Sequence, residues 1–327
     1  MESLDLRVLT DALDWRRAGH AVTLVTVVET WGSAPRPPGA LLAVRDDGVV
    51  SGSVSGGCVE DDLIARIKSG ERGAQQPSMI AYGVSKEEAA RFGLPCGGTL
   101  RLVQEPLRET AWVEELLTRT DAHELIARTL TLATGEVLLQ RAGREAGMQF
   151  DGLTLTTLFG PKWRLLLIGA GQLSQAVAQI AQMLDFEVLV CDPREEYAAT
   201  LTVAGASRIA GMPDDVVREL KADAHTAVVA LTHDPKLDDM ALLEALRSNA
   251  FYVGALGSSR NQAGRKKRLA EHFDLTEAEL ARLHGPVGLR IGAKTPAEIA
   301  VAIVAQIIEV KNALVAGPVA APGCAVT

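Results

Sequence analysis

Two cysteines in this chain stand beside paired glycines, in surroundings where a thiol and exposed backbone could together hold a ligand. Cys58 follows Gly56 and Gly57, and Cys96 precedes a second pair of glycines. Glycine lets backbone N–H groups approach a ligand without a side chain in the way. Two thiols reached in this way suit metal binding, sulfur transfer or a sulfur-bearing ligand. The alternative is that both are small buried hydrophobic residues.

The acidic residues that follow Cys58 make it a weaker candidate than Cys96. A cysteine at the start of a helix can have its thiolate stabilised by the helix dipole. The apolar spacing predicts a helix from Val59 to Ser69, but three acids, Glu60 to Asp62, fall in its first turn and oppose a negative sulfur. No further ligands follow at the spacing of a zinc site. We therefore expect a ligand cradle lined by backbone, without zinc.

A proline-rich stretch upstream of this loop holds a single arginine. Arg36 stands between Pro35 and Pro37. Prolines stiffen the chain and reduce the entropy lost when a nearby side chain is fixed, so Arg36 is predicted to clamp a phosphate group. An exposed structural arginine is the alternative interpretation.

A second glycine loop lies farther along the chain, between a predicted strand and a predicted helix. Gly169 and Gly171 are followed by Ser174 where a dinucleotide-binding loop has its third glycine, and Asp192 ends the next strand. Such a loop places phosphate oxygens at a helix N-terminus, and the acid would bond a ribose hydroxyl. The pattern predicts a Rossmann-type domain that binds NAD(P) or another nucleotide; Asp192 disfavours a 2′-phosphate, whereas Arg194 keeps NADP open. The alternative is a Rossmann-type domain whose pocket is empty or repurposed.

Two more polar loops follow predicted strands of the same domain. The segment 232–235 (Thr-His-Asp-Pro) comes directly after one strand, and Gly257 and Arg260 come after another. Ligands of open α/β sheets bind outside the carboxyl ends of the strands, so both loops should border the crevice. His233 could act as acid, base or metal ligand, and Arg260 could hold an anion. For Asp234, which precedes a proline, we favour an ordinary helix cap.

The elements that must position these residues fall into two domains. The pattern of residues 1–160 predicts a mixed α+β domain, with a helix near 111–129. Residues 161–312 alternate strand and helix with short links, which predicts a Rossmann-like, doubly wound parallel sheet. Residues 313–327 lack a period and are expected to form a flexible tail. The basic run from Arg265 to Arg268 is interpreted as a solvated helix face, with an anion-steering edge as the alternative.

Strands of the first domain are predicted from runs of β-branched and apolar residues. The segment 46–48 (Asp-Asp-Gly) separates two such runs and predicts a hairpin. Further strands are expected at 21–29, 78–82, 99–104, 136–140 and 153–158.

The bulk composition limits the classes of function. The chain has 327 residues and a net charge of −8. An acidic protein lacks the basic face that nucleic acid needs, so no nucleic-acid partner is expected. The N-terminus carries early acids, and no apolar run is long enough to span a membrane, so we expect neither a signal peptide nor membrane association. Scattered cysteines without a CxxC pair indicate free thiols and a cytoplasmic protein, and Cys191 and Cys324 are interpreted as incidental.

Taken together, these motifs resemble the XdhC/CoxI family, the maturation factors of molybdenum hydroxylases such as xanthine dehydrogenase. The resemblance covers nearly the whole chain to about residue 312, and its first-domain motifs are highly specific. The family more often has a histidine where Gln172 stands and a glycine at Ser174, and these departures bear on dinucleotide binding. The segments that carry the resemblance are 32–36, 52–60, 93–98, 169–171, 232–234, 252–258, 285–289 and 291–300.

The resemblance implies a protein that binds the molybdenum cofactor, keeps it from oxidation, supports its sulfuration and inserts it into a hydroxylase. A cofactor with a phosphate tail and two sulfurs suits a glycine-rich crevice, an arginine and nearby thiols. The expected partners are a molybdenum hydroxylase, a cysteine desulfurase and a second copy of the chain in a homodimer. The protein is then an accessory factor; the main alternative is an NAD(P)-dependent oxidoreductase, and a third is a structural adaptor whose glycines serve only tight turns.

Overall fold

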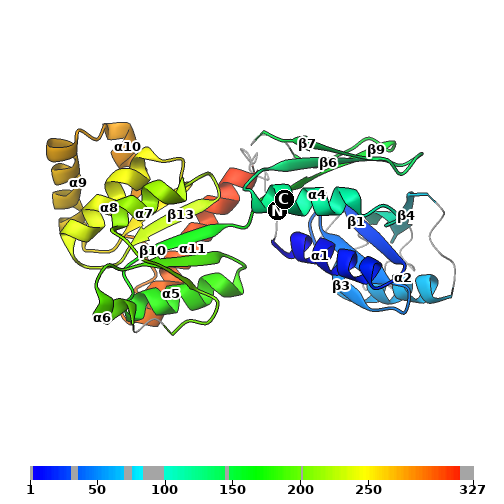
Figure 1. Ribbon diagram of the computed structural model, residues 1–327, viewed down its shortest axis with the longest axis horizontal. Coiled ribbons are helices and arrows are strands. Elements are labelled where there is room, and N and C mark those ends of the chain that lie inside the picture. The colour runs from blue at the N-terminus through cyan, green and yellow to red at the C-terminus, as the bar shows by residue number, and fades with distance from the viewer. Residues whose placement is uncertain are drawn as a thin grey trace, which may run out of the picture. The chain divides into compact units, whose positions relative to one another are not determined.

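The computed structural model divides into two compact units, Met1–Pro161 and Lys162–Thr327 (Figure 1). Cys96 and Cys324 lie outside the residues that it describes. Among the described helices, none is long and apolar enough to cross a membrane. The described residues are 3–30, 36–69, 76–83, 99–143, 147–199 and 202–316.

The first unit is built around an antiparallel sheet with the described strands in the order β3-β2-β1-β5-β4. Successive residues of a strand point to opposite faces. In β1, Val22 and Leu24 therefore pack with helix α1, whereas Val25 and Val27 pack with helix α2. The hairpin predicted around Asp46–Gly48 is confirmed, because β2 pairs with β3. The elements are α1 (Ser3–Arg17), β1 (Val22–Thr30), β2 (Leu41–Arg45), β3 (Val50–Gly52), α2 (Cys58–Lys68), β4 (Ser78–Tyr82) and β5 (Leu100–Pro106).

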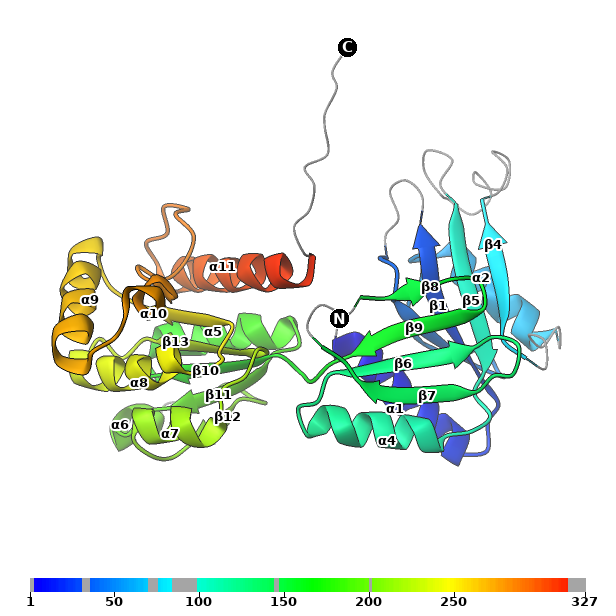
Figure 2. The ribbon, with the colours of Figure 1, turned by 90° about the horizontal axis from the view of Figure 1, so that it is seen from above.

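A second antiparallel sheet, β7-β6-β9-β8, belongs to the same unit (Figure 2). The helix predicted over 111–129 is wrong beyond Asp121, because His123 has a left-handed backbone with a φ of 62° that the helix cannot continue through. From Ile126 onward alternate residues are buried, which is the period of a strand. The elements are α4 (Ala111–Asp121), β6 (Ile126–Thr131), β7 (Val137–Arg141), β8 (Gln149–Phe150) and β9 (Thr154–Phe159).

The second unit is a parallel sheet with the described strands in the order β12-β11-β10-β13-β14-β15. The chain starts in the middle at β10, moves outward to β12 and then crosses to β13, which is the order of a doubly wound Rossmann sheet. The predicted α/β class is confirmed. The strands are β10 (Arg164–Ile168), β11 (Glu187–Cys191), β12 (Ser207–Ile209), β13 (Thr226–Ala230), β14 (Tyr252–Ala255) and β15 (Leu283–His284).

Helices cover both faces of this parallel sheet (Figure 1). Strand β10 is buried along its whole length and divides its side chains between two cores. Leu165 and Leu167 pack with α5 and α11, whereas Leu166 and Ile168 pack with α7 and α8. The helices are α5 (Gln172–Met183), α6 (Glu195–Ala198), α7 (Pro213–Leu220), α8 (Pro235–Arg247), α9 (Ser259–Phe273), α10 (Glu277–Ala281) and α11 (Pro296–Ala316).

Helix α11 extends farther than the sequence pattern predicts. It includes residues 313–316, which we expected in the flexible tail. The sequence has no glycine or proline between Pro296 and Gly317, so nothing in this stretch ends a helix.

Candidate functional site

The glycine loop of the second unit lies at the carboxyl edge of the parallel sheet, where the strand order reverses between β10 and β13. Gly169 follows β10 with a φ of 107°, a conformation that residues with side chains rarely adopt. A Cβ atom on Gly169 would lie 3.1 Å from the backbone nitrogen of Thr232, which comes after β13. The glycine therefore lets the two loops approach closely, at the place where ligands of such sheets bind.

Helix α5 begins directly after this loop with its first amides uncapped by a side chain. Its N-cap residue is Gly171, which offers no capping group. A Cβ atom on Gly171 would meet nothing within 4 Å, so the space beside it is open. Ser174 is buried, and its hydroxyl finds no hydrogen-bond partner among the described residues. The helix N-terminus is thus available to an anion.

Asp192, predicted to bond a ribose hydroxyl, has both carboxylate oxygens occupied by donors of the chain itself. Its side chain is fully buried. Its Oδ2 accepts a hydrogen bond from the amide of Ala170, 2.9 Å away in the middle of the glycine loop. Arg194 supplies the other donors, its backbone amide at 3.1 Å and its Nε and Nη2 at 2.9 and 2.8 Å. Asp192 therefore holds the glycine loop in place through the amide of Ala170.

These hydrogen bonds also set the charge of Asp192. Burial raises the pKa of the carboxyl, but the bonds from Arg194 and from the amide of Ala170 outweigh burial and hold the pKa below its ordinary value. Asp192 is therefore a carboxylate at neutral pH.

Arg194 occupies a fixed position next to this acid. Its guanidinium carbon lies 4.1 Å from the centre of the Tyr197 ring, a cation–π contact, and its side chain is 27% exposed. Asp192 is the main cause of a raised pKa of Arg194, and Asp234 adds to it. The loops that follow β11 and β13 therefore share one electrostatic environment.

The loop after β13 turns His233 outward and uses Asp234 as a helix cap. His233 has a left-handed φ of 63°, and its exposed side chain makes no hydrogen bond to a described residue. The Oδ1 atom of Asp234 accepts a hydrogen bond from the amide of Lys236 at 2.9 Å, at the start of α8. The interpretation of Asp234 as a cap is confirmed.

A buried ionic cluster fixes the loops at this edge of the sheet. Arg265 of α9 donates hydrogen bonds to Asp238 and Asp239 of α8 at 2.9 and 3.0 Å, and Arg268 donates to Asp239 at 2.7 Å. The hydroxyl of Thr232 donates to Asp238 at 2.7 Å. The interpretation of the basic run as a solvated face is therefore wrong for Arg265, which is buried, whereas the side chain of Arg268 is 42% exposed. Buried carboxylates need such partners, and the guanidinium groups supply them.

Gly257 and Arg260 stand at the start of α9, beside the ionic cluster. Gly257 has a φ of 144°, and a Cβ atom there would approach the side-chain nitrogen of Gln262 to 3.2 Å. That nitrogen donates to the carbonyl of Ala255 at 2.9 Å. Arg260 is exposed and makes no hydrogen bond or ion pair with a described residue. The glycine here serves a tight turn, and the arginine is available to an anion.

The glycine- and serine-rich loop of the first unit folds around the side chain of Glu60. The amides of four successive residues, Val54 to Gly57, donate to this carboxylate at 2.8 to 3.0 Å. The hydroxyls of Ser53 and Ser55 add two more hydrogen bonds. Burial raises the pKa of Glu60, but these donors outweigh it and lower the pKa to about 2. The expected cradle exists, and a carboxylate of the chain itself occupies it.

Cys58 is the first residue of α2, directly after this loop, and its side chain is exposed. Neither Gly56 nor Gly57 would bring a Cβ atom within 4 Å of another group. Arg36 is partly buried, and residues 31–35 before it lie outside the described part of the chain. Cys96 also lies outside the described part of the chain. That Cys58 and Cys96 serve one site therefore stays a prediction.

The predicted site residues divide between the two units. In the part of the chain that the structure describes, no three ligating side chains are grouped so that they could hold a metal ion. The first unit contains Arg36, Gly56, Gly57 and Cys58, and the second contains Gly169, Gly171, Asp192, His233, Gly257 and Arg260.

Sequence reasoning missed the roles of Glu60 and Tyr197. Glu60 stands at the third position of α2, where an acid reaches back to the amides before the helix, and that spacing was a usable signal. Tyr197 follows Arg194 by three residues, and Arg194 is the N-cap of the short helix that contains Tyr197, so the two side chains come together at its start.

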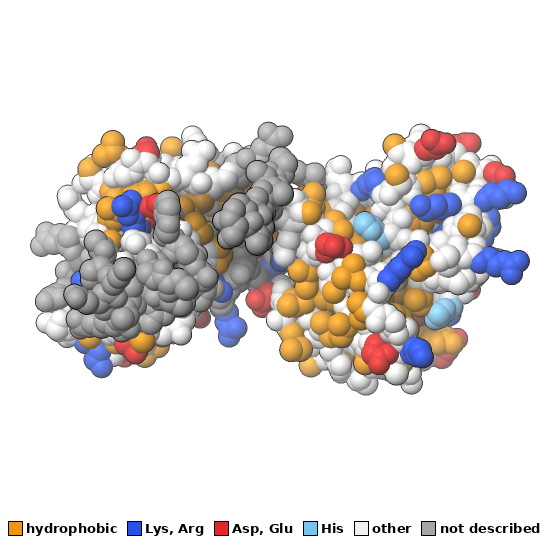
Figure 3. Space-filling view, turned by 180° about the vertical axis from the view of Figure 1, so that it is seen from behind, with side chains coloured by type: hydrophobic (Ala, Val, Ile, Leu, Met, Phe, Trp, Pro, Cys, Tyr) orange, Lys and Arg blue, Asp and Glu red, His pale blue; other side chains and the backbone are white. Residues whose placement is uncertain are grey.

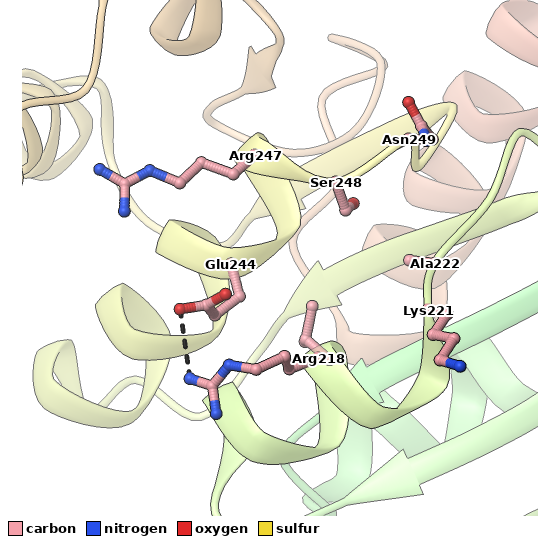
Figure 4. Close-up of a pocket in the computed structure, with 8 residues that line it drawn as sticks. Arg218, Lys221, Ala222, Glu244, Arg247, Ser248 and Asn249 are labelled. Atoms are coloured by element: carbon pink, nitrogen blue, oxygen red, sulfur yellow. Dashed lines mark hydrogen bonds and ion pairs between the residues drawn. The ribbon is translucent and has the colours of Figure 1, made fainter.

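A separate pocket of about 280 Å³ lies at the opposite edge of the parallel sheet, where α7 and α8 end (Figure 4). Arg218 donates a hydrogen bond to Glu244 at 3.3 Å, and Lys221 and Arg247 also line the pocket. None of the predicted site residues lines it, so we place the candidate site at the carboxyl edge.

Two family models match this chain. The model described as the XdhC Rossmann domain matches residues 165–307, within the parallel-sheet unit. The model of the XdhC and CoxI family matches residues 15–83, which include the loop that holds Glu60. Both glycine loops therefore fall in matched regions.

Known proteins resemble the chain over both units. A probable xanthine dehydrogenase subunit from Bacillus subtilis is 30% identical, over 88% of this chain and 93% of its own. The molybdenum cofactor insertion chaperone PaoD of Escherichia coli is 29% identical, over 93% of this chain and 88% of its own. A crystal structure described as a xanthine dehydrogenase of Bacillus halodurans has a TM-score of 0.77 and 25% identity, and the match covers 96% of each chain.

Proposed function

The chain belongs to the XdhC and CoxI family, and from that premise we propose that it binds the molybdenum cofactor and inserts it into a molybdenum hydroxylase of the xanthine dehydrogenase type. The observation that carries the proposal is the similarity over 93% of the chain to PaoD, which is named a molybdenum cofactor insertion chaperone. On this proposal the protein protects the cofactor from oxidation and supports its sulfuration before transfer. Its role is that of an accessory factor and not of an enzyme with a substrate of its own.

The crevice of the second unit supports binding of the phosphate end of the cofactor. The uncapped amides at the start of α5 suit an anion. Exposed cationic and polar side chains on the loops after β13 and β14 add donors. On this proposal Asp192 holds the glycine loop in place and does not touch the ligand. The residues that we assign to contact are Gly169, Gly171, His233 and Arg260, and Gly257 serves the turn that precedes Arg260.

The exposed thiol of Cys58 supports a role of the first unit in the sulfuration of the cofactor. Because Glu60 already takes the amides of the neighbouring loop, the thiol and not the loop backbone is the group left to interact. We propose that Gly56 and Gly57, which have no side chains, leave open space around this thiol. Arg36 and Cys96 are assigned to the same site. A cysteine desulfurase is the proposed source of sulfur, and the cytoplasm is the proposed compartment.

A homodimer formed through the face of α5 and α11 is part of the proposal. Helix α5 has no charged residue, and α11 has none between Glu298 and Glu309. Met183 and Val301, on or beside this face, are 84% and 50% exposed, and hydrophobic side chains gather on one side of the second unit (Figure 3). Two chains of net charge −8 meet with least repulsion on a face without charges. Sedimentation velocity should therefore give the mass of a dimer.

Retention of the cofactor tests the proposed function directly. The purified full-length protein is incubated with molybdenum cofactor and desalted, and the fluorescence of oxidised pterin is measured in the protein fraction. We expect near-stoichiometric pterin. The matched variant Cys58→Ser should retain less, whereas Cys191→Ser, which changes a buried thiol, should retain as much as wild type.

An NAD(P)-dependent oxidoreductase is the second candidate, favoured by the doubly wound strand order and by the glycine loop after β10. The same protein preparation is titrated with NADH and NADPH and assayed for turnover of the nicotinamide. Turnover without retained pterin would replace the first candidate by the second.

A further inference from the structure

The crevice of the second unit lacks the group that would receive a ribose diol. In dinucleotide-binding domains an acid at the end of the second strand accepts hydrogen bonds from the ribose hydroxyls. Here that acid is Asp192, whose side chain has no exposed surface and whose oxygens accept hydrogen bonds from Ala170 and Arg194. A ribose diol would have to displace Arg194 to reach the carboxylate.

Arg194 offers a different group at the same place. Its Nε and Nη2 atoms bind Asp192, whereas Nη1 makes no hydrogen bond to a described residue. The Tyr197 ring lies 4.1 Å from the guanidinium carbon, and 27% of the side chain is exposed. A guanidinium held from two directions loses little freedom when its remaining nitrogen binds an anion.

The surroundings of Arg194 offer further donors to an anion. Asp192 is taken up by Arg194 and by the glycine loop, and one carboxylate oxygen of Asp234 accepts a hydrogen bond from the first turn of α8. The amides at the start of α5 have no side-chain cap, and His233 is exposed. A phosphate monoester brings a charge of about −1.5 to −2 and three acceptor oxygens. A phosphate inside a pyrophosphate linkage brings one charge and two free oxygens to the same position, so it satisfies fewer of the donors around Arg194.

We propose that Arg194 binds a terminal phosphate monoester, so that the crevice prefers ligands ending in a monoester over ligands that present a pyrophosphate linkage or a free ribose diol there. The inference rests on the proposed function, because the molybdenum cofactor ends in a phosphate monoester in its plain form, whereas in its nucleotide-bearing form that phosphate is joined to the nucleotide through a pyrophosphate linkage. The 2′-phosphate of NADPH is the same chemical group from another source.

Two ligand pairs that differ in this group test the inference on the full-length protein. One pair is the plain molybdenum cofactor and its cytidine dinucleotide form, and the other is NADPH and NADH. Dissociation constants are measured by equilibrium dialysis at pH 7.5 and fixed ionic strength. We expect at least a tenfold preference for the monoester in one pair, and that pair identifies the source. A preference below tenfold in both pairs overturns the inference.

Variants of the ion pair show whether Arg194 is the cause of the preference. The double variant Asp192→Asn/Arg194→Gln replaces two charges by amides of similar shape, so we expect it to keep its Tm within a few degrees while the preference falls to about twofold. Arg194→Lys keeps the charge without the planar fork and should keep part of the preference. Arg260→Gln removes another exposed cation and should weaken both members of a pair alike. A double variant that keeps the full preference overturns the inference.

The outcomes separate this inference from the proposed function. A wild-type protein that retains neither form of the cofactor contradicts the proposed function, and the NADPH–NADH pair then decides the inference alone. A wild-type protein that retains both forms equally and does not prefer NADPH supports the proposed function and overturns the inference.

Discussion

Each unit has a glycine-rich loop in front of a helix, and in each a carboxylate of the chain accepts hydrogen bonds from that loop. In the first unit Glu60 takes the amides of all four residues from Val54 to Gly57. In the second unit Asp192 takes one loop amide, that of Ala170, and is closed off by Arg194. The first loop is therefore satisfied from within, whereas the second leaves the start of its helix to a ligand.

The difference between the two loops depends on where the acid comes from. Glu60 lies on the helix that follows its own loop, so the helix carries the carboxylate into the centre of the loop. Asp192 comes from the end of the neighbouring strand and accepts a hydrogen bond from one amide of the loop. Glycine content alone therefore does not show whether a loop binds a ligand, because an internal acid can take the same amides.

The largest expected effect is on Gly52, at the start of the first loop. Gly52 has a φ of 85°, and a Cβ atom would lie 2.2 Å from the carbonyl oxygen of Leu41. Since backbone must move to admit it, we expect Gly52→Ala to lower the free energy of unfolding by about 3 kcal/mol in urea denaturation. The control is Gly171→Ala, because φ there is −72° and the space around the residue is open. Equal losses of unfolding free energy in the two variants would contradict the expectation that only Gly52 needs to be a glycine.

The second-largest loss in the free energy of unfolding is expected when the acid that fills the first loop is removed. Glu60→Ala leaves the amides of residues 54–57 without their acceptor, so we expect a loss of about 2 kcal/mol in the free energy of unfolding. Asp61→Ala is the matched control, because it removes an exposed acid from the same helical turn. If the two variants unfold at the same urea concentration, Glu60 does not organise the loop.

Acid should weaken the first loop through the same carboxylate. The pKa of Glu60 is about 2 in the folded chain and about 4.5 in the unfolded chain, so the folded pKa is lowered. Its stabilisation is therefore complete above about pH 4.5 and is lost as the pH falls toward 2. The gap in unfolding free energy between wild type and Glu60→Gln should narrow between pH 5.5 and pH 2.5. A gap that stays constant would assign the stabilisation to something other than ionisation.

The smallest loss in the free energy of unfolding is expected when the ion pair of Asp192 and Arg194, beside the second loop, is broken. Arg194→Ala leaves Asp192 with two backbone amides, those of Ala170 and of position 194, and the exposed part of the site admits water, so we expect a loss of about 1 kcal/mol in the free energy of unfolding. The measurement is again urea denaturation, with Arg260→Ala as the control for an exposed arginine without a partner among the described residues. A loss as large as that of Glu60→Ala would make the two loops equivalent.

The parallel sheet could be predicted from sequence because its strands are buried on both faces and its helices are amphipathic. The runs at 165–168 and 227–231 contain almost only apolar residues, and they match β10 and β13 closely. Strands β12 and β15 were missed because two or three residues carry no detectable period. The break after Asp121 was missed because the left-handed turn there uses His123, and not a glycine.

The candidate site could be located from sequence but not drawn in detail. Loops at strand ends had to meet at one edge, and those of Gly169 and Thr232 do. The direction of a carboxylate could not be predicted in this way. Whether Asp192 meets a ligand or its own backbone depends on distances of a few ångströms, which only the packed fold sets. The same limit applied to Arg265, whose partners on α8 lie 26 and 27 residues away in the sequence.

The buried ionic cluster beside the crevice has a consequence for the rate at which a ligand is released. Arg265 and Arg268 tie α9 to Asp238 and Asp239, and Asp238 in turn holds Thr232 in the loop after β13. We expect a loop held in this way to keep its position when a ligand arrives and when it departs. Residence time then depends on the contacts that the ligand breaks. For a carrier of the proposed kind, handover becomes a direct competition for the cargo, which a recipient that binds it more tightly can win.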